Sequence, residues 1–325
     1  MKAVVCKRFG GPEVLELEDV PDPQPGPGEL IVEVRACSVT FPDLLMLQDK
    51  YQFKPGLPFV PGGEVAGVVH QVGEGVDRFT KGDRVLGSSL HGGGLAEQAV
   101  VRAESAVALP DNIAFEDAAG LLYGYGTSHH ALKDRARLQA GESLLVLGAA
   151  GGVGLAAVEL GRAMGARVIA AASTDEKLEV CRAHGADSTI NYTTEDLKTR
   201  VRELTDGRGA DVVYDPVGGP YSEPALRSTA WEGRFLVIGF AAGDIPRIPL
   251  NLALLRGCSI VGVFWGSFVA REPERHRANV AELVEWWTSG RLAPYTSATY
   301  PLERAADALR ELAERRATGK VVVTP

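Results

Sequence analysis

The chain of 325 residues lacks the features of secreted, membrane-spanning and nucleic-acid-binding proteins. It has no run of about 18 apolar residues, the length that a membrane-spanning helix requires, and its N-terminal segment has no apolar core like that of a signal peptide. Basic residues number 34 and acidic residues 42, which gives a net charge of −8. Such a charge disfavours nucleic acid and anionic membrane surfaces as partners. We therefore expect a soluble, cytoplasmic protein with no nucleic-acid and no membrane partner.

Cysteine is also scarce. The four cysteines are Cys6, Cys37, Cys181 and Cys258, and no two of them stand at the spacing of a zinc site or of a redox pair. We expect free, buried thiols, as in proteins of the reducing cytosol.

Residues 1 to about 118 contain many short β-rich segments, for example 30–39 and 63–73, separated by stretches rich in proline and glycine. No long segment with helical periodicity precedes residue 114. This pattern predicts a compact, barrel-like, mainly β unit.

From about residue 120 to residue 262 the pattern changes to α/β. Predicted helices at 154–165, 175–185 and 194–207 each end in a glycine, which suits a left-handed helix cap. Predicted strands alternate with helical segments and lie at 143–148, 167–172, 188–192, 210–218, 234–239 and 258–263. Such alternation predicts a doubly wound parallel sheet, the Rossmann arrangement.

The last zone contains two amphipathic helices, 272–290 and 302–319, and a final strand, 320–325. We therefore expect a Rossmann domain at 119–262, inserted into a mainly β catalytic domain that comprises 1–118 and 263–325.

The sequence LGAAGGVG, residues 147–154, directly follows a predicted strand and directly precedes a predicted helix. Gly148, Gly151 and Gly154 stand three residues apart, with Gly152 in addition. This spacing permits a tight turn, close approach of the backbone to a pyrophosphate, and close packing of helix on strand. We predict a dinucleotide site.

The next predicted strand ends in Ala171, Ala172 and Ser173, where a site for NAD usually carries an acidic residue. Lys177 follows within reach and suits a 2′-phosphate, although a solvated surface lysine is the alternative. Asp175 and Glu176 stand nearby and would serve as helix-capping charges. The sequence thus favours NADPH as the cofactor.

The chain resembles the zinc-free NADPH:quinone oxidoreductases (zeta-crystallin-like) of the medium-chain dehydrogenase/reductase superfamily along nearly its whole length. The resemblance rests on FGGPEVLELEDVPDP, PFVPGGEVAGVV, GAAGGVG, DPVGG and GKVVV, in this order. It implies that the mainly β domain is GroES-like and that the protein is a homodimer. A sheet edge at 258–263 would be covered by the partner.

The resemblance also bears on zinc. Thr40 and Gly63 stand where the alcohol-dehydrogenase branch has a cysteine and a histidine ligand, and neither residue is a good zinc ligand. The cysteines of the structural zinc lobe have no counterpart between Gly87 and Asp111. His91, His129 and His130 lack cysteine or carboxylate partners in their local pattern, so we expect surface or packed histidines and no metal.

Two residues are the candidate catalytic groups. Thr40 stands where many relatives have asparagine, and Tyr51 matches a tyrosine near the substrate pocket, although a half-buried packing tyrosine is equally common. Glu64 lies in a glycine-rich apolar run, and its counterpart in relatives is mainly structural. The implied cofactor residues are Phe41, Thr127, Gly148, Gly151, Gly152, Val153, Gly154, Ser173, Lys177, Tyr192, Gly239, Phe240, Ala241, Val263, Phe264, Trp265 and Arg316. For Arg316, compensation of a helix dipole is the alternative.

These features predict hydride transfer from NADPH to a small-molecule acceptor, either a quinone or another conjugated carbonyl compound. The alternatives are reduction of an enone or enoyl thioester, and a non-catalytic regulatory protein that binds NADPH.

Overall fold

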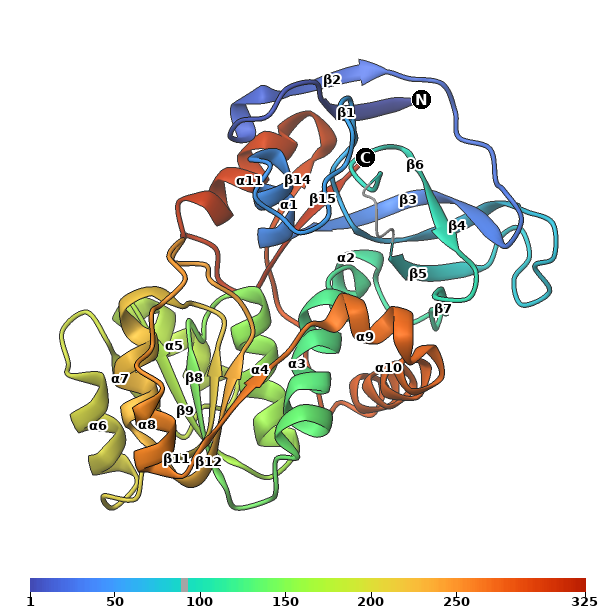
Figure 1. Cartoon of the computed structure of the whole chain (residues 1–325). Coiled ribbons are helices and arrows are strands. Elements are labelled where there is room, and N and C mark those ends of the chain that lie inside the picture. Colours follow the sequence, from blue (N-terminus) through green and yellow to red (C-terminus); the bar gives the residue numbers. More distant parts are fainter. Residues whose placement is uncertain (89–92) are drawn as a thin grey trace. The chain divides into compact units, whose positions relative to one another are not determined.

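The chain folds into two compact units in the computed structural model, which describes residues 1–88 and 93–325. Unit 1 comprises Met1–Tyr123 and Pro294–Pro325, and unit 2 comprises Gly124–Ala293 (Figure 1). Unit 2 is therefore inserted into unit 1 along the sequence, as expected.

Unit 1 is mainly β. Within the described residues, a seven-stranded sheet has the order β14-β15-β3-β4-β5-β7, and β6 pairs with β3. A separate antiparallel pair is formed by β1 and β2. The strands are β1 (Lys2–Cys6), β2 (Leu15–Asp19), β3 (Glu29–Val39), β4 (Glu64–Val72), β5 (Arg84–Ser88), β6 (Gln98–Arg102), β7 (Val107–Ala108), β14 (Thr296–Pro301) and β15 (Lys320–Thr324). The mainly β character predicted for this region is confirmed.

Short helices accompany this sheet: α1 (Phe41–Leu47), α2 (Phe115–Ala118), α11 (Ala305–Ala313) and the 3-10 turns Pro12–Val14 and Leu302–Arg304. Leu44 and Leu47 of α1 and Leu309 of α11 are buried in one apolar core with Val32 of β3 and Val323 of β15. The sequence did not predict α1, because seven residues that include Pro42 carry little helical periodicity.

Unit 2, all of whose residues are described, contains a six-stranded sheet of order β10-β9-β8-β11-β12-β13. All five pairings are parallel. The strands are β8 (Ser143–Leu147), β9 (Arg167–Ala172), β10 (Ser188–Asn191), β11 (Ala210–Asp215), β12 (Thr229–Val237) and β13 (Ser259–Gly262). The order along the sheet reverses between β8 and β11, which is the switch point of the Rossmann fold.

Helices cover both faces of this sheet (Figure 1). Leu145 and Leu147 of β8 pack with residues of the helices α6, α7 and α8 on one face of the sheet. Leu144 points to the other face, toward α4, where a Cβ added to Gly161 would lie 2.5 Å from Cδ2 of Leu144. Burial on both faces explains why β8 is continuously apolar. The helices are α3 (Thr127–His129), α4 (Gly152–Ala163), α5 (Asp175–Ala183), α6 (Leu197–Leu204), α7 (Ser222–Arg227), α8 (Asn251–Arg256), α9 (Trp265–Arg271) and α10 (Pro273–Thr288). The predicted caps Gly165, Gly185 and Gly207 all have positive φ, as left-handed caps require.

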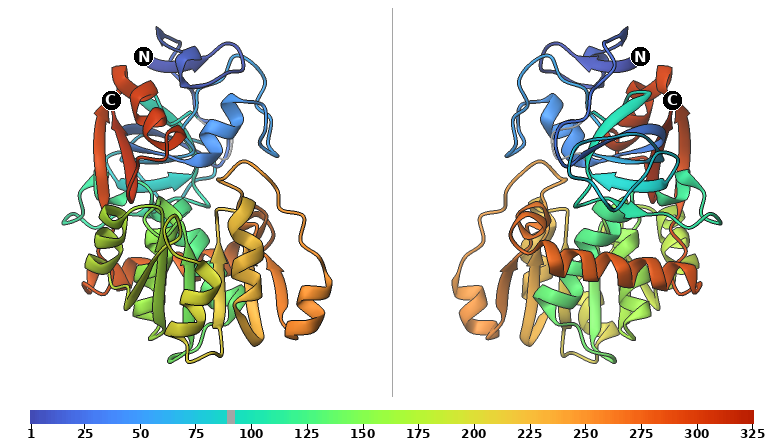
Figure 2. Two further views of the ribbon diagram at one scale, coloured as in Figure 1. Left: turned by 90° about the vertical axis from the view of Figure 1, so that its left-hand side faces the viewer. Right: turned by 90° about the vertical axis from the view of Figure 1, so that its right-hand side faces the viewer.

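Two π-helical segments, Leu121–Gly126 (η2) and His130–Ala136 (η3), flank α3. The long helix α10 lies beside η3 (Figure 2). The two are joined by Asn279 of α10, whose amide donates to Asp134 of η3 at 2.8 Å. This packing places α9 and α10 in unit 2, whereas the expected catalytic domain began at residue 263. The compact units are divided after Tyr123 and after Ala293. The boundaries expected for the catalytic and cofactor-binding domains, after residues 118 and 262, remain a prediction about function. No helix among residues 1–88 and 93–325 combines the length and the apolar character needed to cross a bilayer.

Candidate functional site

All of the residues predicted to bind the cofactor except Phe41 and Arg316 lie in unit 2. Most of them follow the carboxyl end of a strand of the parallel sheet: Gly148 after β8, Ser173 after β9, Tyr192 after β10, Gly239–Ala241 after β12 and Val263–Trp265 after β13. Ligands of open α/β sheets bind at this edge, next to the switch point. The parallel topology thus brings together residues that are far apart in the sequence.

The glycine loop between β8 and α4 has the form that a bound pyrophosphate needs. An added Cβ on Gly154 would collide with the Gly148 carbonyl, so only glycine allows this close packing of helix and loop. Gly151 is the extended N-cap of α4, and an added Cβ there would meet nothing nearer than the Gly148 carbonyl oxygen at 3.4 Å. Bare backbone therefore leads into Gly152 and Val153, the first residues of a twelve-residue helix. The N-terminus of such a helix attracts anions.

Thr127 begins α3 and lies in a segment that is bonded to this loop. The Ser128 hydroxyl donates to the Val153 carbonyl at 2.9 Å and shares a 2.8 Å hydrogen bond with the Tyr214 hydroxyl. The Tyr125 hydroxyl donates to the buried Glu159 carboxylate of α4 at 2.9 Å. These bonds hold Thr127 beside the start of α4.

Ser173, Lys177 and Tyr192 meet where β9 and β10 end. The Lys177 ammonium lies 3.4 Å from the Ser173 hydroxyl, and the Tyr192 N–H donates to the Ala172 carbonyl at 3.2 Å. Asp175 is occupied elsewhere, since it accepts a 2.9 Å hydrogen bond from Asn191. Hydrogen bonding to its own backbone N–H, and then to the Thr174 hydroxyl, lowers the pKa of Glu176 at the helix N-terminus. The nearby acids therefore act as local capping groups, and the cation remains at the strand end.

The loops after β12 and β13 complete the edge. Ala241 donates its N–H to Pro216 at 3.1 Å, and Val263 donates to Val237 at 3.0 Å. Trp265 is buried and contacts His276 edge to face, with ring centroids 5.5 Å apart, whereas Phe264 is exposed. Phe240 borders Gly218, where a Cβ would lie 2.8 Å from its ring.

The other candidate residues belong to unit 1, where Thr40 is fully engaged with a buried carboxylate. Both its N–H and its hydroxyl donate to Asp43 Oδ2 at 2.7 Å, and Gly62 donates its N–H to Asp43 Oδ1 at 3.0 Å. Thr40 thereby caps α1. The sequence analysis missed Asp43, although a threonine followed three residues later by an acid is the pattern of a capping box.

Tyr51 and Phe41 are partly buried and pack on the unit 1 core. Burial, followed by the charge of Asp43, raises the pKa of Tyr51. Arg316 also belongs to unit 1, where its guanidinium pairs with Glu311 at 3.0 Å and with Glu314.

Glu64 is fully buried on β4 and anchors the π-helical turn. Its carboxylate accepts hydrogen bonds from the backbone N–H groups of Leu122 at 2.7 Å and Tyr123 at 3.0 Å. Burial raises its pKa to about 7, against the opposing effects of these hydrogen bonds and of Lys320. These contacts give Glu64 a structural role in unit 1.

The described residues contain no group of three or more histidine, cysteine, aspartate or glutamate side chains that could hold a metal ion. His129 and His130 are buried, and His130 stacks on Phe268 with centroids 3.8 Å apart and bonds Asp134 at 2.7 Å. His91 lies outside the described residues. All four cysteines are free thiols, three of them buried.

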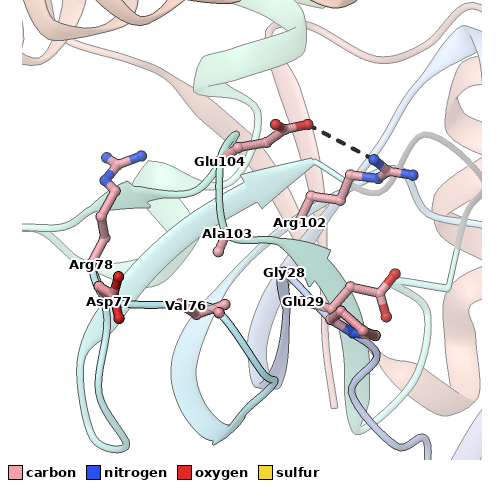
Figure 3. A pocket seen from close by; sticks show the side chains of 10 residues that line it. Gly28, Glu29, Val76, Asp77, Arg78, Arg102, Ala103 and Glu104 are labelled. Carbon is pink, nitrogen blue, oxygen red and sulfur yellow. Dashed lines mark ion pairs between the residues drawn. The ribbon is translucent and has the colours of Figure 1, made fainter.

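A surface cavity of about 540 Å³ lies in unit 1, lined by Pro27, Gly28, Glu29, Gly75, Val76, Asp77, Arg78, Arg102, Ala103 and Glu104 (Figure 3). Its charged side chains include Arg102 and Glu104, 3.9 Å apart. It contains none of the residues predicted to bind cofactor or substrate.

Comparison with known proteins agrees with this geometry. Residues 26–111 match the family model described as alcohol dehydrogenase GroES-like domain, and residues 152–286 match the one described as zinc-binding dehydrogenase. The chain is 42% identical over 324 residues to a quinone oxidoreductase-like protein 2 homolog of Nematostella vectensis, covering 99% of this chain and 88% of that protein. It is 37% identical to a quinone oxidoreductase of Pseudomonas aeruginosa, covering 100% and 99%.

A solved structure shows the same fold. The crystal structure of Escherichia coli quinone oxidoreductase complexed with NADPH superimposes with a TM-score of 0.93 at 29% identity, covering all of both chains. The GroES-like and Rossmann assignments are confirmed.

Proposed function

Because the chain belongs to the quinone oxidoreductase family of the medium-chain dehydrogenase/reductase superfamily, we propose that it transfers hydride from NADPH to a quinone or another conjugated carbonyl compound, without zinc. The observation that carries this proposal is the carboxyl edge of the unit 2 sheet. There the glycine-rich N-terminus of α4 offers a place for a pyrophosphate. Ser173 and Lys177, which lie in contact, offer a place for a 2′-phosphate.

The residues of unit 2 fit NADPH. Gly151, Gly152 and Val153 would hold the pyrophosphate, Ser173, Lys177 and Tyr192 the 2′-phosphate, and Thr127 the nicotinamide side. When bound, NADPH supplies the hydride. The task of the chain is to orient the acceptor and to stabilise the charge that develops on its oxygen.

The residues of unit 1 do not fit zinc. The Thr40 hydroxyl is bonded to Asp43, and Gly63 has no side chain. The Cys37 thiol is buried close to the backbone of Gly62 and Gly94, where added Cβ atoms would lie 2.7 and 2.8 Å from its sulfur. Burial keeps the pKa of this thiol well above its usual range. No catalytic step is therefore assigned to a metal ion.

The choice of acceptor follows from this chemistry. A simple ketone concentrates the developing charge on one oxygen, whereas a quinone or an enone spreads it over a conjugated system that needs less help from the protein. The phenol of Tyr51 can orient such an oxygen and can deliver a proton to an enone.

We also propose a cytoplasmic homodimer. One edge of the unit 2 sheet is β13, with Ile260 41% exposed. The preceding helix α8 carries Leu254 at 80% exposure, and its N-cap residue Leu250 is 77% exposed. An open sheet edge beside exposed leucines suits association with a second copy. The free thiols support a reducing compartment.

The test is an acceptor panel with purified protein and deuterated NADPH. We expect ortho- or para-quinones, or conjugated alkenes, to be reduced, and matched saturated ketones and primary alcohols to remain nearly unchanged. Deuterium at the carbinol carbon of a saturated ketone, at a rate equal to that of the conjugated partner, would contradict the proposal. NADPH binding without reduction of any acceptor would favour the regulatory alternative.

A further inference from the structure

The acceptor site needs a hydrogen-bond donor that Thr40 does not supply. A threonine hydroxyl has one proton, and Thr40 donates it to Asp43 Oδ2 at 2.7 Å. Toward a carbonyl oxygen it therefore presents only lone pairs. The donors that stabilise the developing charge must come from other side chains.

Tyr123 lies where such a donor is expected. A Cβ added to Gly63 would lie 2.5 Å from the Tyr123 hydroxyl oxygen, so this phenol fills the space that a side chain at position 63 would occupy. Neighbouring Gly62 is bonded to Asp43, which also holds Thr40. The phenol is thus part of the same group of residues as Thr40.

Tyr51 belongs to this group as well. The Asp43 carboxylate acts electrostatically on both phenols, and Tyr51 acts electrostatically on Tyr123. Burial raises the pKa of Tyr123, as it does for Tyr51, so both hydroxyls keep their protons at neutral pH.

Two contacts position Tyr123. The Ser88 hydroxyl donates to the Tyr123 hydroxyl oxygen at 3.2 Å, and Glu64 accepts a hydrogen bond from the Tyr123 N–H at 3.0 Å. A phenol that accepts a hydrogen bond becomes a stronger donor through its own O–H, because successive hydrogen bonds polarise one another.

We propose that Tyr123 is a second phenol of the acceptor site, which donates a hydrogen bond to the carbonyl oxygen of the acceptor together with Tyr51, and that Ser88 positions it. This inference rests on the proposed function and names the residue through which unit 1 recognises its acceptor. No proton is transferred by Tyr123 in this role, which is to bind and polarise the oxygen while the acceptor receives hydride from NADPH.

The experiment compares Tyr123→Phe, Tyr51→Phe and Ser88→Ala with the wild type and with Tyr295→Phe, which removes a hydroxyl from an exposed tyrosine of unit 1. We expect Tyr123→Phe to lower kcat/KM for 1,4-naphthoquinone roughly 3- to 10-fold, the effect of one neutral hydrogen bond. The Kd for NADPH should stay within twofold, and Tyr295→Phe should match the wild type. Ser88→Ala should lower kcat/KM in the wild-type background and have little effect in Tyr123→Phe, since it acts through that hydroxyl.

Gly63→Ala provides a second way to move the hydroxyl and should reproduce the loss, with Tm measured for every variant. The Kd for 1,4-naphthoquinone, measured by calorimetry in the presence of NADP⁺, separates this inference from the proposed function. A wild type that binds the quinone without reducing it, together with weaker binding by Tyr123→Phe, would support the inference while the proposed reaction fails. Unchanged kcat/KM and unchanged quinone Kd in Tyr123→Phe would overturn the inference while the proposed reaction stands. A wild type that neither binds nor reduces the quinone would also overturn the inference. Additive effects of Ser88→Ala and Tyr123→Phe would contradict the role given to Ser88.

Discussion

At the scale of single residues, we expect Lys177 to contribute most to a preference for NADPH over NADH. Its ammonium lies beside the Ser173 hydroxyl, while Asp175 and Glu176 are occupied by Asn191 and Thr174. A positive charge at this strand end suits a 2′-phosphate, whereas an acid would suit a 2′-hydroxyl.

Replacing Lys177 with alanine should weaken NADPH binding about 10- to 100-fold, because a charge-assisted hydrogen bond contributes about 1.5–3 kcal/mol. The affinity for NADH should hardly change. Fluorescence titration with both nucleotides measures the effect, and Lys198→Ala on α6 is the matched control. Equal losses for the two nucleotides would contradict the assignment of the 2′-phosphate.

Glu64 makes stability depend on pH. Its pKa in the folded protein is about 7, above the ordinary value of 4.5, chiefly because it is buried. The folded state therefore binds more protons than the unfolded state between these values, and this group's contribution to stability falls as pH rises through that window. The difference is on the order of 3 kcal/mol, at about 1.4 kcal/mol for each pKa unit.

In urea unfolding at pH 5 and pH 8, Glu64→Gln should lose this part of the pH dependence. The wild type should gain stability relative to the variant at pH 5 and lose it at pH 8. Parallel pH profiles for the two proteins would show that Glu64 titrates outside this window.

Among the elements, α1 is the one whose start depends most on a single side chain. Asp43 accepts three hydrogen bonds, two from Thr40 and one from Gly62, and is almost fully buried. Seven residues are too few to hold a helix by propensity alone, so the cap and the apolar contacts of Leu44 and Leu47 must do so.

Asp43→Ala should lower the free energy of unfolding by about 2–4 kcal/mol, because it leaves buried N–H groups without acceptors. Thermal unfolding followed by circular dichroism measures this effect. Asp111→Ala, at an exposed position, should change stability by no more than about 0.5 kcal/mol. A loss for Asp43→Ala as small as that would refute the capping role.

For the whole molecule, the open edge at β13 predicts self-association. A negative charge introduced at Ile260 or Leu254 of each copy would face the same charge on the other copy across the proposed interface, and the two would repel each other. Ile260→Asp combined with Leu254→Asp should therefore convert a dimer into a monomer in sedimentation at micromolar concentration. Leu17→Asp, on β2 of unit 1, should leave the dimer intact, and a wild type that sediments as a monomer would refute the proposal.

The sequence predicted the parallel sheet closely, because strands buried on both faces and helices capped by glycine leave strong local signals, as at β8 and Gly165. Most of the residues predicted to bind the cofactor lie at one edge of this sheet, since every parallel strand delivers its next residue to that edge. The sequence analysis missed Tyr123, whose importance lies in contacts with Gly63 and Ser88, far away in the sequence. It also placed the hydroxyl of Thr40 at the acceptor without foreseeing that Asp43 takes its proton. Contacts between distant residues leave no periodicity to detect.

The π-helical turn Leu121–Gly126 has an evolutionary consequence. A π-helical turn holds one residue more than an α-helical turn, so deletion of one of its residues would let the segment relax to an α-helix and would shift the residues within the turn, while those on either side keep their positions. Tyr123 would then leave Gly63, and its N–H would leave Glu64. Homologues that keep a tyrosine at this position should therefore also keep the length of this segment. The extra residue of the π-helical turn, relative to an α-helical one, would identify such homologues even where the surrounding sequence has diverged.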